Sequence, residues 1–133
     1  MELKETGRIH SPYKTVKEAP RQGKLSDKFC EIEIFPAYEA ALLHVEDGKY
    51  YVVLYFAHKA DRTALRTVPP WAKEPYGVFA SRSPHRPNPI NLCVVKLVRR
   101  EKNRLFVIGL DAIDGSSLID IKPYVKELDE AEV

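Results

Sequence analysis

The densest group of side chains with chemical potential lies between Gly77 and Asn91. This segment carries two arginines, a histidine and Asn88 on a backbone with three prolines in six residues. Proline fixes its own φ and disfavours helix at the preceding residue, so Ser83, Arg86 and Asn88 are predicted to be extended. A stiff segment rich in donors favours a preorganised binding surface. The alternative is a rigid surface loop whose charges only face water.

Several reaction classes lack their usual patterns. The chain contains no GxGxxG segment, P-loop, GxSxG elbow or HExxH pair. Cys30 and Cys93 are not in CxxC spacing, and the four histidines show no metal-ligand spacing, so we expect reduced buried thiols and no metal. His58 and Lys59 follow the most apolar run of the chain. These two residues could contact a ligand, or they could simply form the polar end of a strand.

The charge distribution is uneven, although the net charge is only +2. Residues 58–104 hold eleven lysines and arginines against three acidic residues, and the flanking segments are acidic. A polyanion would be attracted to this basic middle. The alternative is that these cations are scattered around the folded surface. Candidate phosphate contacts are Arg62, Arg66, Arg86, Arg99, Arg100, Arg104 and Lys122.

The elements that must position these residues are mostly strands. Strand patterns occupy residues 30–34, 92–98, 105–110 and 117–121, and residues 50–57 form a continuous apolar run that predicts a central strand buried on both faces. Residues 99–104 predict a hairpin connection, and Asp114-Gly115 predicts a turn. A short helix is predicted at residues 38–45. We therefore expect a mainly β fold, a compact single-sheeted antiparallel β-barrel with one or two short helices and long functional loops.

Two long irregular segments, 11–28 and 58–76, contain most of the remaining unusual chemistry, and loops of that length are usually functional or disordered. The 133 residues suffice for one domain. No apolar run approaches the roughly 20 residues of a membrane span, and the N-terminus lacks the apolar stretch of a secretory signal. We expect a cytoplasmic protein with one domain at residues 1–126 and an acidic tail at 127–133.

The motif GVFASRSPHRPNPI at residues 77–90 resembles the TrmO/TsaA-like family (the YaeB group) of tRNA methyltransferases. Further matching motifs are Pro-Arg-Gln-Gly at residues 20–23, Asp114-Gly115, and Asp-Ile-Lys-Pro-Tyr at residues 120–124. They follow one another in the expected order, and the resemblance extends from Gly7 to Tyr124.

The resemblance implies a β-barrel that binds S-adenosylmethionine without a Rossmann domain. It implies methyl transfer to N6 of threonylcarbamoyladenosine at position 37, in the anticodon loop of tRNA, by a homodimer. The implied cofactor contacts are Pro20, Arg21, Gln22, His58, Lys59, Arg82, Leu92, Ala112, Ile113, Asp114 and Gly115. Exposed aromatic residues such as Tyr50 and Tyr51 would suit the dimer surface.

The sequence departs from the family pattern at Asn91 and Cys93, where Gly and Ser are more common, and we interpret Asn91 as a turn residue that tolerates left-handed backbone. No catalytic base stands out; Asn88, Asp120 and Tyr124 are the candidates. Two other functions remain open. One is a non-catalytic or regulatory module that binds RNA or S-adenosylmethionine, and the other is a methyltransferase with a small-molecule substrate.

Overall fold

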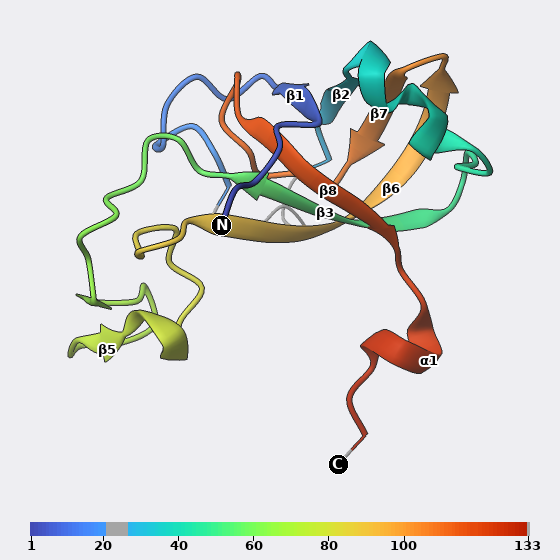
Figure 1. Ribbon diagram of the computed structural model, residues 1–133. Helices are drawn as coiled ribbons and strands as arrows, with labels where there is room; N and C mark the ends of the chain where they lie inside the picture. The colour runs from blue at the N-terminus through green and yellow to red at the C-terminus, as the bar shows by residue number, and fades with distance from the viewer. Residues whose placement is uncertain (21–26, 133) are drawn as a thin grey trace.

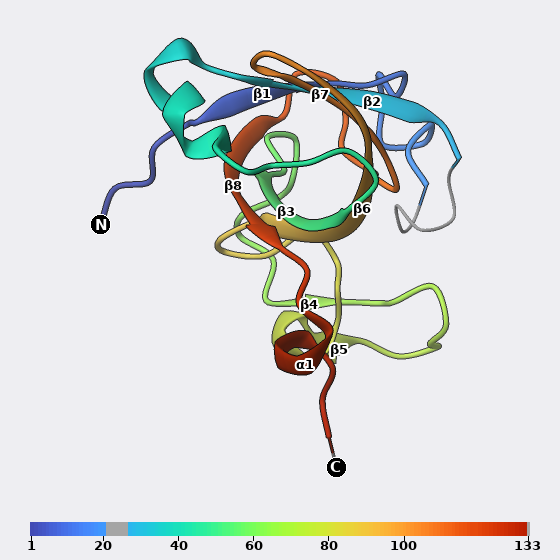
Figure 2. The same cartoon turned by 90° about the vertical axis from the view of Figure 1, so that its right-hand side faces the viewer.

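The computed structural model describes residues 1–20 and 27–132, and its main body is a closed antiparallel barrel. The strands follow one another around the barrel in the order β1-β2-β7-β6-β3-β8. Figure 2 looks nearly along the barrel axis, so these strands form a ring. Their bounds are Gly7–His10 (β1), Phe29–Ile34 (β2), Tyr50–Phe56 (β3), Ile90–Glu101 (β6), Arg104–Ile108 (β7) and Ser117–Pro123 (β8). The predicted mainly β barrel is confirmed.

Side chains along each strand point alternately into the barrel and outward, and this alternation determines which residues form the core. Every second residue is buried along β3 and along β6 from Cys93 to Leu97, as the two-residue period of a strand requires when one face meets a core. The side chains that fill the barrel are mostly aliphatic, with tyrosines and two cysteines among them, and each large aliphatic side chain contributes about 1.5–3 kcal/mol by leaving water. Those exposed by 1% or less include Ile9, Ile32, Val53, Val95, Leu97, Val107 and Leu118.

Three local predictions need correction. The strand at residues 50–57 is buried on one face only, because the barrel has a core inside and solvent outside. Tyr51 therefore points inward and is 7% exposed, while Tyr50 is 52% exposed. The predicted helix is a 3-10 helix, η2, at Pro36–Leu42. Asn91 lies within β6 and is not a left-handed turn residue.

The chain between β3 and β6, residues 58–89, leaves the barrel as a separate layer that we call the arm (Figure 1). Strands β4 (Arg66–Thr67) and β5 (Tyr76–Gly77) pair within it, and the short 3-10 helix η3 covers Val78–Ala80. None of these elements was predicted, since two-residue strands leave no periodic pattern. The arm contributes no residue to the main core cluster.

A single side chain organises the second half of the arm. The Arg86 guanidinium donates hydrogen bonds to the backbone carbonyls of Val78, Ser81 and Ser83, the last at 2.9 Å. A planar group with several donors can bridge carbonyls that do not follow one another in a regular helix. Arg86 thereby fixes the loop that carries residues 81–85.

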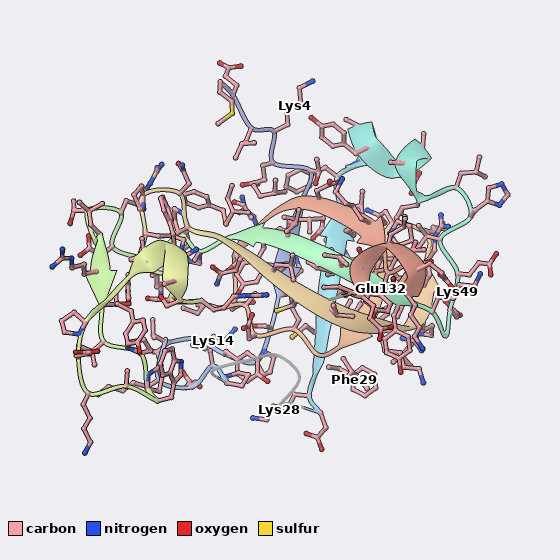
Figure 3. All side chains as sticks on the ribbon, turned by 90° about the horizontal axis from the view of Figure 1, so that it is seen from below. Lys4, Lys14, Lys28, Phe29, Lys49 and Glu132 are labelled. Atoms are coloured by element: carbon pink, nitrogen blue, oxygen red, sulfur yellow. The ribbon has the colours of Figure 1, made fainter. Side chains whose placement is uncertain are left out.

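The barrel has two chemically different ends. One end meets the arm and the segment 11–20, whereas the other carries the β6–β7 hairpin and η2 (Figure 1). Lys14 lies toward the arm and Lys49 at the opposite end (Figure 3). Beyond β8, the predicted tail region contains one short helix, α1, at Lys126–Asp129. Among the described residues, no helix combines the length and apolar composition needed to cross a membrane.

Candidate functional site

A cavity of about 680 Å³ lies between the arm and the adjacent end of the barrel. This size is within the usual range for sites that bind small molecules or cofactors. Three parts of the chain line it: residues 16–20, the arm, and the strand ends and turn of the barrel. The described lining residues include Val16, Pro20, Tyr55, His58, Lys59, Thr67, Trp71, Ser81, Arg82, His85, Asn91, Asp111, Ile113 and Ser116.

Five of the predicted cofactor contacts line this one cavity. They come from distant parts of the sequence and are Pro20, His58, Lys59, Arg82 and Ile113. Arg21 and Gln22 lie outside the described residues. The arm and the barrel therefore bring the proline-rich motif and the polar end of β3 to the same place.

Ala112, Asp114 and Gly115, the other predicted contacts near the turn, do not line the cavity but stabilise the turn next to Ile113. Ala112 is fully buried, and its carbonyl accepts a 2.6 Å hydrogen bond from the Ser11 hydroxyl. Asp114 accepts hydrogen bonds from Lys14 Nζ at 2.7 Å and from the Ser11 backbone N–H at 2.9 Å. These two donors, Lys14 first, hold the pKa of Asp114 below its ordinary value. Gly115 has φ +86°, which confirms the predicted turn.

Leu92, the last of the predicted cofactor contacts, does not line the cavity of this chain, and neither do the three catalytic candidates. Leu92 is on the outer face of β6, opposite Leu54, and is 47% exposed. Asn88 accepts a 3.4 Å hydrogen bond from Arg62. Asp120 forms an ion pair with Lys122 at 3.0 Å, and Tyr124 pairs through its backbone with Tyr50 at the far end of β3.

The predicted phosphate-binding residues divide between the two ends of the molecule. Arg62 and Arg66 are on the arm, where Arg66 directly precedes the cavity-lining Thr67, whereas Arg99, Arg100 and Arg104 are at the hairpin end of the barrel. Arg104 forms an ion pair with Glu31 at 2.8 Å. Arg100 donates to the carbonyls of Leu42 and Lys102, and Arg86 binds the arm carbonyls, so both guanidinium groups have structural partners. The basic middle of the sequence is not one continuous patch.

The histidines and lysine at the cavity have defined partners. His58 Nδ1 lies 3.5 Å from the Ser116 hydroxyl. Lys59 Nζ donates to the Lys14 carbonyl at 3.2 Å, which joins the arm to the segment 11–20. The Asp61 backbone N–H donates to His85 Nδ1 at 2.9 Å, so the proton of the neutral ring is on Nε2.

Sequence reasoning missed the polar floor of the cavity. The Tyr55 hydroxyl donates to Asp111 Oδ1 at 2.5 Å, and Asn91 Nδ2 donates to the Tyr55 oxygen at 3.0 Å. Cys93 Sγ lies 3.0 Å from the same Asp111 oxygen. One signal was available: Asp111 is the first acidic residue after an apolar strand pattern, and a polar residue at a strand end is positioned rigidly. The two departures from the family pattern both belong to this network.

One group elsewhere could hold a cation. His10, Glu31 and Glu33 place ligand atoms within 4.8 Å of one another on the outer surface of β1 and β2. The spacing of the histidines in sequence could not reveal it, because the carboxylates come from the neighbouring strand. His10 bonds Glu33 at 2.9 Å and Arg104 pairs with Glu31, so ion pairing accounts for the cluster.

The closed barrel, the arm and the cavity between them define a small β-barrel domain with a ligand-sized cavity at one end. The family described as the tRNA-methyltransferase O N-terminal domain matches residues 8–130. The chain belongs to this family, as the motifs predicted.

Similar proteins match between 74% and 98% of this chain. An S-adenosyl-L-methionine-binding protein of Archaeoglobus fulgidus is 52% identical over 129 residues, which are 97% of this chain and 93% of that protein. The tRNA (adenine(37)-N6)-methyltransferase of Mus musculus is 36% identical over 104 residues, 74% of this chain and 24% of that protein. The crystal structure of TrmO from Pseudomonas aeruginosa has a TM-score of 0.82 and 32% identity, covering 98% of this chain and 59% of that one.

Proposed function

We propose that this protein is a methyltransferase that uses S-adenosylmethionine to methylate N6 of threonylcarbamoyladenosine at position 37 of tRNA. The observation that carries the proposal is the cavity of about 680 Å³ that gathers the proline-braced motif, the end of β3 and the turn before β8. Family membership supports it, and so do the names of the relatives. S-adenosylmethionine supplies an electrophilic methyl group on a positively charged sulfur.

The cavity has the chemical groups that this cofactor needs. Lys59 and Arg82 on the arm side suit its carboxylate, and Asp111 on the barrel side suits a positive charge. Trp71 and Ile113 offer apolar surface for the adenine ring. Two buried hydroxyls of the arm, Thr67 Oγ1 and Ser81 Oγ, have no hydrogen-bond partner in the described structure, as expected where a polar ligand completes the site.

The protein's main task in this reaction is alignment. Methyl transfer to nitrogen is an in-line displacement, so holding the two reactants in place supplies much of the acceleration. The rigid strand ends of the barrel fix one wall and the Arg86-braced arm fixes the other. The nitrogen can lose its proton to solvent after the methyl arrives, so Asn88, Asp120 and Tyr124 need not act as bases.

The arm is the surface we assign to tRNA. It exposes Phe79 by 92%, together with Arg62, Arg66 and Lys73. Aromatic rings stack on unpaired bases, and nearby cations attract the phosphate backbone. An anticodon loop presents both features. The hairpin arginines are at the opposite end of the barrel, and we assign them no phosphate contact.

We also propose that the protein is a cytoplasmic homodimer. The outer face of β3 and β6 carries apolar cross-strand pairs: Val52 with Val94, Leu54 with Leu92, and Phe56 with Ile90. Leu92 is 47% and Val94 43% exposed, which favours a partner surface. A Val94→Lys variant should sediment as a monomer if this face forms the dimer, and an unchanged dimer would place the contact elsewhere.

Methyl incorporation from labelled S-adenosylmethionine tests the reaction. Two tRNA preparations are compared, one carrying threonylcarbamoyladenosine and one lacking the threonylcarbamoyl group. We expect label only in the modified tRNA, at the adenosine beside the anticodon. Label in both tRNAs would refute the requirement for the modification.

A binding module without catalysis is the second candidate, because several similar proteins are named only as S-adenosyl-L-methionine-binding proteins. Cofactor binding by calorimetry with no methylation of either tRNA would favour this candidate. It would also leave the small-molecule methyltransferase open, which a screen of amine acceptors would address.

A further inference from the structure

The floor of the cavity is a chain of hydrogen bonds that ends on a carboxylate. Tyr55 and Asn91 face each other across the β3–β6 pair with their side chains inside the barrel mouth. Asn91 donates to Tyr55 at 3.0 Å, and Tyr55 donates to Asp111 Oδ1 at 2.5 Å. The Cys93 thiol, 3.0 Å away, contacts the same oxygen. Tyr55 and Cys93 hold Asp111 in one orientation directly, and Asn91 holds Tyr55.

Asp111 is the negative partner in this network. Burial first, and then the charge of Asp111, raise the pKa of Tyr55 well above its ordinary value, so the phenol keeps its proton and acts as the donor. The described hydrogen bonds reach Oδ1, and no described residue bonds Oδ2. Asp111 is also the one acidic side chain among the described residues that line the cavity. It therefore presents a negative charge with an open oxygen.

No described cation neutralises this charge. Asp114, three residues further along, is paired with Lys14 at 2.7 Å, but the ion pairs of the described chain do not include Asp111. The cavity's own cations, Lys59 and Arg82, come from the arm, whereas Asp111 comes from the barrel. A partly desolvated carboxylate in a ligand cavity is stabilised when the ligand brings the opposite charge.

We propose that Asp111 contacts the sulfonium of S-adenosylmethionine and makes the cavity prefer this cofactor over its demethylated product, S-adenosylhomocysteine. The inference rests on the proposed function and adds the residue that distinguishes reactant from product. The ligand's ammonium and carboxylate share one carbon atom, so cations of the arm hold that end of the molecule. The sulfonium, two methylene groups away, is the positive charge that can reach the barrel side.

The reaction itself removes this contact. When the S–CH₃ bond breaks and the N–CH₃ bond forms, the sulfur becomes a neutral thioether. The positive charge passes to the acceptor nitrogen, which then loses a proton to solvent. Asp111 consequently attracts the reactant and not the product, and S-adenosylhomocysteine is released more readily.

Calorimetry on the 133-residue chain tests the proposal. The wild-type protein should bind S-adenosylmethionine at least tenfold more tightly than S-adenosylhomocysteine, a difference of about 1.4 kcal/mol. Asp111→Asn keeps the size of the side chain and an acceptor for Tyr55, and should reduce that ratio to within twofold of one. Glu46→Gln removes a carboxylate that pairs with Lys49 outside the cavity lining, and should leave the ratio unchanged.

Other outcomes decide against specific parts of the argument. Equal binding of the two ligands by the wild type, or an equal loss for both in Asp111→Asn, would overturn the proposal, because the sulfonium would not be what Asp111 recognises. Binding of neither ligand would instead refute the proposed function.

Tyr55→Phe removes a donor but keeps the charge, so the preference for S-adenosylmethionine should persist, and its loss would also overturn the proposal. If Asp111→Asn does not fold, a second probe is sinefungin, in which a carbon bearing a positively charged amine replaces the methylated sulfur. It should bind the wild type more tightly than S-adenosylhomocysteine, and weaker binding would refute the contact.

Discussion

Replacing Arg86 should weaken cofactor binding without unfolding the barrel. The side chain was predicted to contact tRNA phosphate, but its guanidinium donates to the carbonyls of Val78, Ser81 and Ser83. These bonds hold the loop that places Arg82 and His85 at the cavity. Arg86→Ala therefore removes the support of one cavity wall, whereas Arg86→Lys keeps the charge and loses the planar group that bridges three carbonyls.

The expected size follows from the number of bonds lost. A hydrogen bond from a charged group contributes about 1.5–3 kcal/mol when buried, and the half-exposed position of Arg86 favours the lower end. Three such bonds, discounted for solvent, stabilise the ordered arm by about 3 kcal/mol. If the ordered arm of the wild type is more stable than the disordered arm by about 2 kcal/mol, losing these bonds leaves only about 15% of the Arg86→Ala molecules with an ordered arm. The apparent Kd then rises about sixfold.

Three measurements on the same samples distinguish arm support from phosphate contact. Calorimetry should show weaker S-adenosylmethionine binding in both variants, and hydrogen exchange should show lost protection in residues 78–86. Urea unfolding of the barrel should change by less than about 1 kcal/mol, because the arm lies outside the core cluster. Lys73→Ala, an exposed arm residue, is the control for loss of charge. Unchanged cofactor affinity in Arg86→Ala, with a shallower salt dependence of tRNA binding, would refute the reasoning.

Gly7→Ala should destabilise the barrel by about 1–3 kcal/mol in urea unfolding, because an added Cβ would lie 2.3 Å from a backbone oxygen of β2, whereas Gly77→Ala meets nothing within 4 Å and should be neutral. Burial, the largest cause, raises the pKa of Cys30 to about 11. Iodoacetamide should therefore leave Cys30 unmodified at pH 8 until the protein unfolds, and stability should fall as pH rises from about 9 through 11, because the unfolded thiol ionises first. Arg66→Ala should reduce the salt slope of tRNA binding by about one unit, while Arg104→Ala should leave it unchanged; the reverse result would place tRNA at the hairpin end.

The regular part of the fold could be predicted because its signals are local. Alternating apolar residues identify β2, β6 and β7, and Asp114-Gly115 marks a turn that has the expected positive φ. Strand β1, with only four residues, leaves too short a pattern to recognise. The prediction that residues 50–57 are buried on both faces was wrong, since sequence alone does not tell whether a second layer covers an apolar outer face.

The candidate site was only partly accessible to the same reasoning. Motifs pointed to His58, Lys59 and Arg82, whose side chains meet at the cavity. They pointed equally to Asp114, which is paired with Lys14, and gave no reason to choose Asp111. The partner of a carboxylate depends on contacts across about a hundred residues of sequence, and only the folded chain defines them.

The sequence by itself determined the barrel's alternating strands, the family to which the chain belongs, and a proline-braced segment rich in donors, because periodicity and backbone restriction act between near neighbours. The tertiary structure decided which charged side chains are paired within the described fold and which are available to a ligand. Closure of the barrel and placement of the arm put Asp111 at the cavity with no ion-pair partner among the described residues. They also join Arg86 to backbone carbonyls and divide the basic residues between two ends. Electrostatic roles depend on distance and burial, and both are properties of the fold.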